Sequence, residues 1–213
     1  MRYAILSDIH GKLGPLEAAL ADAQQLGAET FISLGDVGSD ACFDLLRSVE
    51  AIGVFGNWEV SRWRELSTPN QLFVLSLTPI FVGDDFLATH AAPWWPEGSR
   101  TVVDIMDYML ARGIKWRELF PYLDEDEAAR WQALAELENR DKQVLFHGHT
   151  HHREVWRIGP TGRMVRLTRR EITLNARAHY LVGVGSLARP EKGGTAGYAL
   201  FDDVTRTVEM REV

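Results

Sequence analysis

The sequence has a single cysteine, Cys42, and fewer basic residues than acidic ones. A lone cysteine excludes an internal disulfide framework and favours a reducing compartment. The 23 lysines and arginines against 30 aspartates and glutamates give a net charge of −7, which argues against a general electrostatic grip on nucleic acid phosphates. No hydrophobic run is long enough for a secretory signal or a membrane span. These absences predict a soluble cytoplasmic protein without a nucleic acid or membrane partner.

The chain of 213 residues is sized for one domain with some additional elements, because about 150 residues is a usual domain length. Its 46% hydrophobic content is ordinary for a globular fold that buries its own core. No fixed-period repeat or low-complexity tract separates two halves. We therefore interpret residues 1–213 as a single domain.

Strand and helix patterns alternate in the first third of the chain. Short apolar runs predict strands at 3–6, 30–34 and 51–55, and helical spacing of apolar residues predicts helices around 16–23, 42–49 and 58–66. Such alternation is typical of right-handed βαβ crossovers and a largely parallel sheet. The remaining strands are expected at 72–77, 80–82, 86–89, 143–146, 154–158, 163–168, 171–174, 180–184, 198–201 and 205–211.

Residues 93–142 differ from both flanking halves and are interpreted as a helical insertion. Thr101 and Asp104 form a capping-box pattern for a helix that ends at Gly113. Four acidic residues at 124–127 then favour the start of a second helix, which runs to about Asn139.

Polar residues with metal-ligating side chains directly follow five of the predicted strands. The carboxyl ends of strands in an open α/β sheet meet at one crevice, so these residues are expected to lie together. Any single Asp or Asn has an ordinary alternative role as a helix N-cap. Seven such groups share no structural need, and a pair of divalent cations would satisfy all of them. The seven are Asp8, His10, Asp36, Asn57, His90, His149 and His151.

This arrangement resembles the calcineurin-like metallophosphoesterase family. The family's motifs occur in order as Asp8-Ile9-His10, Gly35-Asp36, Gly56-Asn57-Trp58-Glu59, His90 and Gly148-His149-Thr150-His151. The resemblance implies a four-layer αββα sandwich, an α/β fold with helices outside two mixed sheets. It also implies a ligand set for each metal: Asp8, His10 and His151 for one, Asn57, His90 and His149 for the other, with Asp36 between them. Residues 184–190 resemble the Gly-Ser loop of smaller bacterial members.

The chemistry of such a site is hydrolysis at phosphorus. Two metals about 3.5–4 Å apart can hold a bridging hydroxide, present it in line and neutralise phosphoryl charge. Asp36 suits the bridging position because a carboxylate offers two oxygens, and we assign catalytic roles to Asp36 and Asn57. Imidazole, carboxylate and amide donors favour Mn, our first choice, or Fe, Zn, Co or Ni over Mg or Ca.

Trp58 departs from the family pattern, which places a histidine there near the leaving group. An indole N–H cannot deliver a proton near neutral pH, so substrates whose leaving group needs no acid are favoured. His147, His152 and Glu59 are alternative donors, and Trp58 has the simpler interpretation of packing at a helix start.

Substrate contacts are predicted at five positions. Trp94 and Trp95 follow His90 closely, so they either stack on a nucleobase or form a hydrophobic clasp under the insertion. Arg189 and His152 are placed to meet phosphate oxygens, and Trp58 would line the leaving-group side.

We predict a metal-dependent phosphoesterase that acts on a small phosphodiester or nucleotide phosphoanhydride, with dinucleoside polyphosphates first among them. A serine/threonine-type phosphoprotein phosphatase is an alternative if the cleft admits a peptide. Another alternative is a metal-dependent binding member, that is, a protein of this family that lost catalytic turnover together with the histidine. A nuclease is the weakest alternative because no basic groove is evident.

Overall fold

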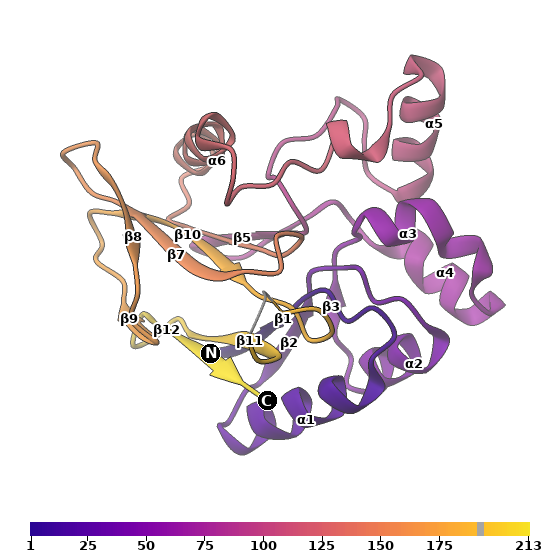
Figure 1. Cartoon of the computed structure of the whole chain (residues 1–213), viewed down its shortest axis with the longest axis horizontal. Helices are drawn as coiled ribbons and strands as arrows, with labels where there is room; N and C mark the ends of the chain where they lie inside the picture. Colours follow the sequence, from indigo (N-terminus) through magenta and orange to yellow (C-terminus); the bar gives the residue numbers. More distant parts are fainter. Residues whose placement is uncertain (191–193) are drawn as a thin grey trace.

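Two six-stranded sheets pack face to face in this computed structural model, which describes residues 1–190 and 194–213 (Figure 1). Three hydrophobic clusters separate four layers. One lies between the sheets, one under the helices of the first sheet, and one between the second sheet and the helix at 127–139. The predicted αββα sandwich is therefore confirmed.

The first sheet joins the N-terminal strands to the C-terminal ones. Its order is β3 (Ile52–Gly53), β2 (Thr30–Ser33), β1 (Arg2–Leu6), β11 (Gly197–Asp202), β12 (Thr207–Glu212) and β9 (Glu171–Thr173). The first three strands are parallel, as the alternating pattern predicts, and the rest pair antiparallel. The connections from β1 to β2 and from β2 to β3 run through α1 (Leu13–Gln25) and α2 (Asp40–Ser48).

The second sheet is also mixed. Its order is β4 (Ile80–Val82), β5 (Phe86–Thr89), β6 (Val144–His147), β10 (His179–Val184), β7 (Arg153–Ile158) and β8 (Met164–Leu167). Strands β5, β6 and β10 are parallel, so β5 and β6 end on the same side.

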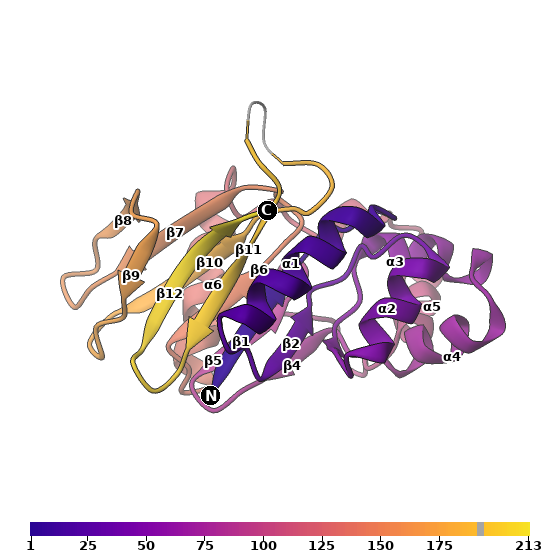
Figure 2. The same cartoon turned by 90° about the horizontal axis from the view of Figure 1, so that it is seen from below.

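The other helices lie beyond the ends of the strands or over the second sheet (Figure 2). They are α3 (Asn57–Arg62), η1 (Trp63–Glu65), α4 (Thr68–Ser76), α5 (Val102–Arg112), η2 (Trp116–Glu118) and α6 (Glu127–Asn139). Thr101 and Asp104 form the reciprocal capping box expected for α5, and Gly113 ends it in the left-handed region. None of the helices in the described ranges is long and apolar enough to cross a membrane.

The predicted strand at 72–77 is wrong, because residues 72–76 belong to helix α4 and Leu77 caps its C-terminal end. Pro69 stands in the first turn, where its missing N–H costs nothing. Asn70 and Val74 are both buried four residues apart, which is the spacing of one helix face. The Asn70 amide also donates to Asp40 and Asp44 of α2, and these bonds dock the helix.

Candidate metal centre

The seven candidate ligands meet at the edge where strands of both sheets end. Asp8 and His10 follow β1, and Asp36 follows β2. Asn57 is the first residue of α3, after β3. From the second sheet, His90 follows β5, and His149 and His151 follow β6.

One group of donors gathers around Asp8. Its Oδ1 lies 3.2 Å from His151 Nε2 and 3.8 Å from His10 Nε2, and the two imidazole nitrogens are 3.3 Å apart. These three side chains are close enough to ligate one ion.

A second group gathers around His90. Its Nε2 lies 3.1 Å from Asn57 Oδ1 and 3.6 Å from Asp36 Oδ1. The other oxygen of Asp36 lies 3.9 Å from His10 Nε2, in the first group. Asp36 therefore stands between the two donor groups, which is the position that the motif comparison implies for it.

Two buried atoms in this cluster that could ligate a metal lack a hydrogen-bond partner among the described residues. They are Asp8 Oδ1 and His149 Nε2. Buried polar atoms are rarely left unpaired, because losing water without replacement is costly. Divalent ions would satisfy both atoms, so the residues present fit the expected metal.

Five of the candidate ligands have an unusual backbone. A positive φ is uncommon for residues other than glycine, and such strain is concentrated at functional sites. These five are Asp8 (54°), His10 (44°), Asp36 (53°), His149 (64°) and His151 (61°). Sharp turns directly after the strands aim their side chains into one crevice.

Neighbouring groups fix the orientation of the ligands. Ser7 donates its hydroxyl to Asp8 Oδ2 at 2.7 Å, and the His149 amide donates to the same oxygen at 2.9 Å. His90 Nδ1 lies 2.8 Å from the Leu34 carbonyl, which leaves Nε2 to face the cluster. Ser186, in the predicted Gly-Ser loop, donates to the Asp8 carbonyl.

Burial and neighbouring groups together set the protonation of the ligands. Burial lowers the pKa of His10 to about 4 and that of His149 to about 3, so both imidazoles are neutral at pH 7 and can bind a metal through a ring nitrogen. Burial and the nearby charge of Asp8 raise the pKa of Asp36 to about 8. Burial alone would also raise the pKa of Asp8, but the close approach of the His151 imidazole and the charge of His90 lower it.

The residue in place of the usual histidine, Trp58, packs its half-buried ring against the cluster beneath the first sheet. Its backbone N–H donates to Asp36 Oδ1 at 2.7 Å. Among the alternative proton donors, His147 and Glu59 are fully buried. His152 lies at the rim, where its Nδ1 is 2.9 Å from Asp124 Oδ2.

Trp94 and Trp95 pack into the protein, as in the clasp interpretation. Trp95 contacts Phe55 and Phe120 edge to face, with ring centres 5.5 and 5.2 Å apart. Trp94 packs on the cluster under α6. Neither ring is among those that contact a candidate ligand in the described residues.

Other aromatic side chains border the centre, and the sequence motifs do not indicate them. Trp116, Phe120 and Tyr122, all from the segment between α5 and α6, surround the His149 imidazole. They reach the centre through the folding of this segment, in which Trp116 and Phe120 pack on the same cluster as the helices of the first sheet.

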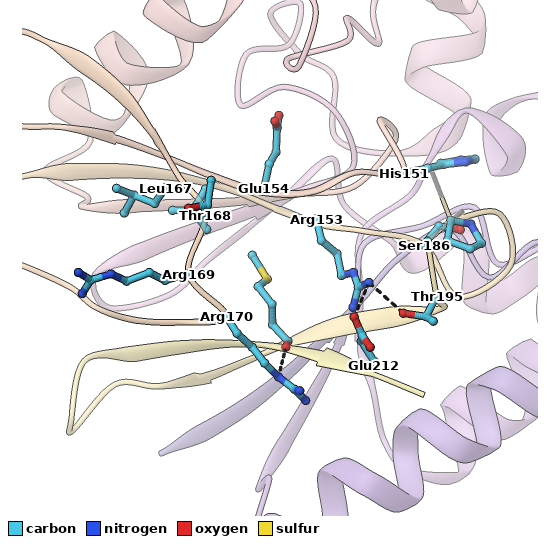
Figure 3. A pocket seen from close by; sticks show the side chains of 14 residues that line it. His151, Arg153, Glu154, Leu167, Thr168, Arg169, Arg170, Ser186, Thr195 and Glu212 are labelled. Carbon is cyan, nitrogen blue, oxygen red and sulfur yellow. Dashed lines mark hydrogen bonds and ion pairs between the residues drawn. The ribbon is translucent and has the colours of Figure 1, made fainter. Parts of the chain in front are cut away.

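A groove of about 280 Å³ begins beside His151 and runs between the sheets (Figure 3). Arg153 crosses it and donates to Thr195 and Glu212. Arg170 donates to a backbone carbonyl, and Arg169 extends away from the other lining side chains (Figure 3). The guanidinium groups of Arg153 and Arg170 are thus hydrogen-bonded within the protein.

Comparison with known proteins assigns the family. The calcineurin-like phosphoesterase superfamily domain matches residues 1–206, so the chain belongs to this family. An uncharacterized protein of Methanocaldococcus jannaschii, MJ0912, is 24% identical, with 99% of this chain and 86% of the relative covered.

Solved structures share the fold. A metallophosphoesterase from Sphaerobacter thermophilus is 22% identical and superimposes with a TM-score of 0.72 over 100% of this chain and 88% of its own. The phosphoesterase YfcE from E. coli is 20% identical, with a TM-score of 0.51 over 95% and 89% of the two chains. An archaeal phosphodiesterase is 14% identical, with a TM-score of 0.52 and full coverage of both chains.

Proposed function

We propose that this chain is a two-metal phosphoesterase that hydrolyses a small phosphodiester or nucleotide phosphoanhydride. The observation that carries the proposal is the position of Asp36, whose two oxygens face different donor groups, at 3.6 Å from His90 and 3.9 Å from His10. In this assignment Asp8, His10 and His151 hold one ion, Asn57, His90 and His149 hold the other, and Asp36 serves both. When bound, two divalent ions supply Lewis acidity for the phosphoryl oxygens and a nucleophilic water at neutral pH.

Two features of the chain favour a small substrate with a good leaving group. The insertion packs aromatic rings against His149, which is only 5% exposed, so one side of the centre is closed to a protein loop. The position of the usual acid is Trp58, which donates no proton near pH 7. Expulsion of a nucleotide phosphate or an aryl oxide needs little help from an acid, whereas expulsion of an alkoxide needs much.

The test combines metal analysis with a substrate panel. With Mn²⁺ restored to chelator-treated protein, we expect hydrolysis of diadenosine tetraphosphate and bis(4-nitrophenyl) phosphate, and little hydrolysis of alkyl phosphates or a phosphopeptide. Asp36→Asn should lower the rate by at least about 100-fold and reduce bound metal, because it removes the charge between the two ions. Asp107→Asn, at an exposed position on α5, is the matched control.

Equal rates for Asp36→Asn and wild type, or no hydrolysis with any of the five metals, would contradict the proposal. A phosphopeptide cleaved faster than the nucleotide would favour the phosphoprotein phosphatase alternative. Tight metal binding without turnover would favour the binding member.

A further inference from the structure

A solvent-facing aromatic ring lies directly beside one of the candidate ligands. The ring centre of Tyr122 is 4.3 Å from that of His149, and the two planes are tilted by 32°. Trp116 meets the same imidazole edge-on at 5.8 Å. Tyr122 is nevertheless 39% exposed. Tyr122 therefore packs on His149 and still reaches solvent.

The loop that carries these rings is anchored at its far end. Asp124 Oδ2 lies 2.9 Å from His152 Nδ1, which belongs to the loop that carries His149 and His151. Arg130 of α6 donates to the carbonyls of Leu123 and Asp124 at 2.6 and 2.9 Å. The rings are therefore held in place by the metal loop and by α6, as an organised binding surface requires.

Two exposed arginines, one on η2 and one in the Gly-Ser loop, lie on segments that border the centre. The exposed Arg117 lies over the Trp116 ring at 5.4 Å. The exposed Arg189 belongs to the Gly-Ser loop, where its backbone N–H donates to Ser186 Oγ and Ser186 in turn donates to the Asp8 carbonyl. Neither guanidinium has an ion pair within the described ranges 1–190 and 194–213. In a chain of net charge −7, these side chains suit additional phosphates on a ligand.

We propose that Tyr122 and Trp116 form a recognition surface that stacks on a planar ring, so that the substrate carries a nucleobase. Arg117 lies beside this surface for a phosphate further from the cleaved bond. This inference rests on the proposed function and specifies its substrate class as a nucleoside polyphosphate or nucleotide diester. Stacking of a base on an aromatic side chain contributes enough for about a tenfold difference in affinity.

Binding to the metal-free protein tests the surface independently of catalysis. In the presence of a chelator, AMP is expected to bind about tenfold more tightly than ribose 5-phosphate, which lacks the base. Tyr122→Leu should remove that difference, whereas Tyr122→Phe should keep it because the ring remains. Tyr108→Leu changes the same residue type on α5 of the same insertion and should behave as wild type. Melting curves of each variant confirm that it is folded.

Kinetics of the metal-loaded protein separate this inference from the proposed function. Tyr122→Leu should raise KM for diadenosine tetraphosphate about tenfold more than it raises KM for inorganic tetraphosphate, which has no base to stack. Equal AMP and ribose 5-phosphate affinities in the wild type, or a folded Tyr122→Leu that retains the difference, would overturn the recognition surface. If Tyr122→Leu is active and its ratio of KM for diadenosine tetraphosphate to KM for inorganic tetraphosphate equals that of wild type, the recognition surface is overturned as well. The phosphoesterase proposal would then still stand. If the wild-type protein hydrolyses neither substrate, the result counts against the proposed function. The comparison of AMP with ribose 5-phosphate binding would still test the recognition surface.

Discussion

The carboxylate of Glu59 accepts the backbone N–H of Asp36 at 2.9 Å, although Asp36 follows β2 and Glu59 lies in the first turn of α3. The same carboxylate accepts the amides of Val37 at 2.8 Å and Gly56 at 2.7 Å. Glu59 is fully buried, and burial, with the nearby Asp36 charge, raises its pKa to about 7. One side chain thus ties the loop of Asp36 to the loop of Asn57, and it acts as a positioning residue.

Glu59→Ala is expected to destabilise the protein by about 3 kcal/mol, because three buried amides would each lose an acceptor. Bound metal should fall at the same time, since the loop of Asp36 loses its anchor. Glu59→Gln keeps one side-chain oxygen that can accept from these amides. Its loss of unfolding free energy should therefore be less than half that of Glu59→Ala. Urea unfolding and metal analysis check both variants. Wild-type stability of Glu59→Ala would show that the amides find other acceptors.

Metal binding at pH 7 is expected to release protons. Asp36, with its pKa raised to about 8, is largely protonated at this pH in the metal-free protein and must lose the proton to ligate a cation. His10 and His149, with pKa values of about 4 and 3, are already neutral and release nothing. Calorimetric titration with Mn²⁺ in two buffers of different ionisation enthalpy measures the release. Identical heats in both buffers would show that Asp36 is already ionised.

Trp58→His should increase hydrolysis of alkyl phosphates more than that of aryl diesters. The imidazole would add a proton donor where the family has one, and only poor leaving groups need it. The test is the ratio of kcat values for an alkyl and an aryl substrate, with Trp58→Phe as a control for lost packing. A rise shared by both substrates would indicate easier access rather than acid catalysis. No rise despite bound metal would favour the binding member.

The convergence of the candidate ligands could be predicted because each of them is specified locally. A strand, a sharp turn and a polar residue occupy a few consecutive positions, as at Asp8 and at Asp36. Parallel strands then bring their ends together without further information. The four-layer arrangement was implied by the resemblance to the family, whereas the alternation of strands and helices indicated only a largely parallel sheet.

What surrounds the ligands depends on contacts that are distant in sequence. Trp94 and Trp95 follow His90 closely, yet Ala91 and Ala92 are buried and the chain carries both indoles into hydrophobic clusters. Tyr122 is 27 residues from His149 and reaches it only through the fold of the insertion. The segment at 72–77 was ambiguous for another reason, since a short apolar run fits a strand or a helix until its partner is known.

Far from the metal centre, Asp22 of α1 joins this helix to the first sheet. It accepts two hydrogen bonds from Arg211, at 3.0 and 2.9 Å, and one from the Tyr198 hydroxyl at 2.7 Å. The Arg211 hydrogen bonds lower the pKa of Asp22 below its ordinary 3.8. A lowered carboxyl pKa stabilises the folded state above the unfolded value, and this contribution disappears as the pH falls through the folded value.

Asp22→Asn should therefore cost about 1 kcal/mol at pH 7, and the difference from wild type should narrow as the pH falls below about 4. Urea unfolding across that pH range measures it, with Asp107→Asn as the exposed control. A difference that stays constant with pH would mean that lost packing, rather than the charge on Asp22, explains the effect. Asp22 lies on α1 and Arg211 near the end of β12, both away from the candidate ligands. Asp22→Asn should therefore keep its metal content, in contrast to Glu59→Ala.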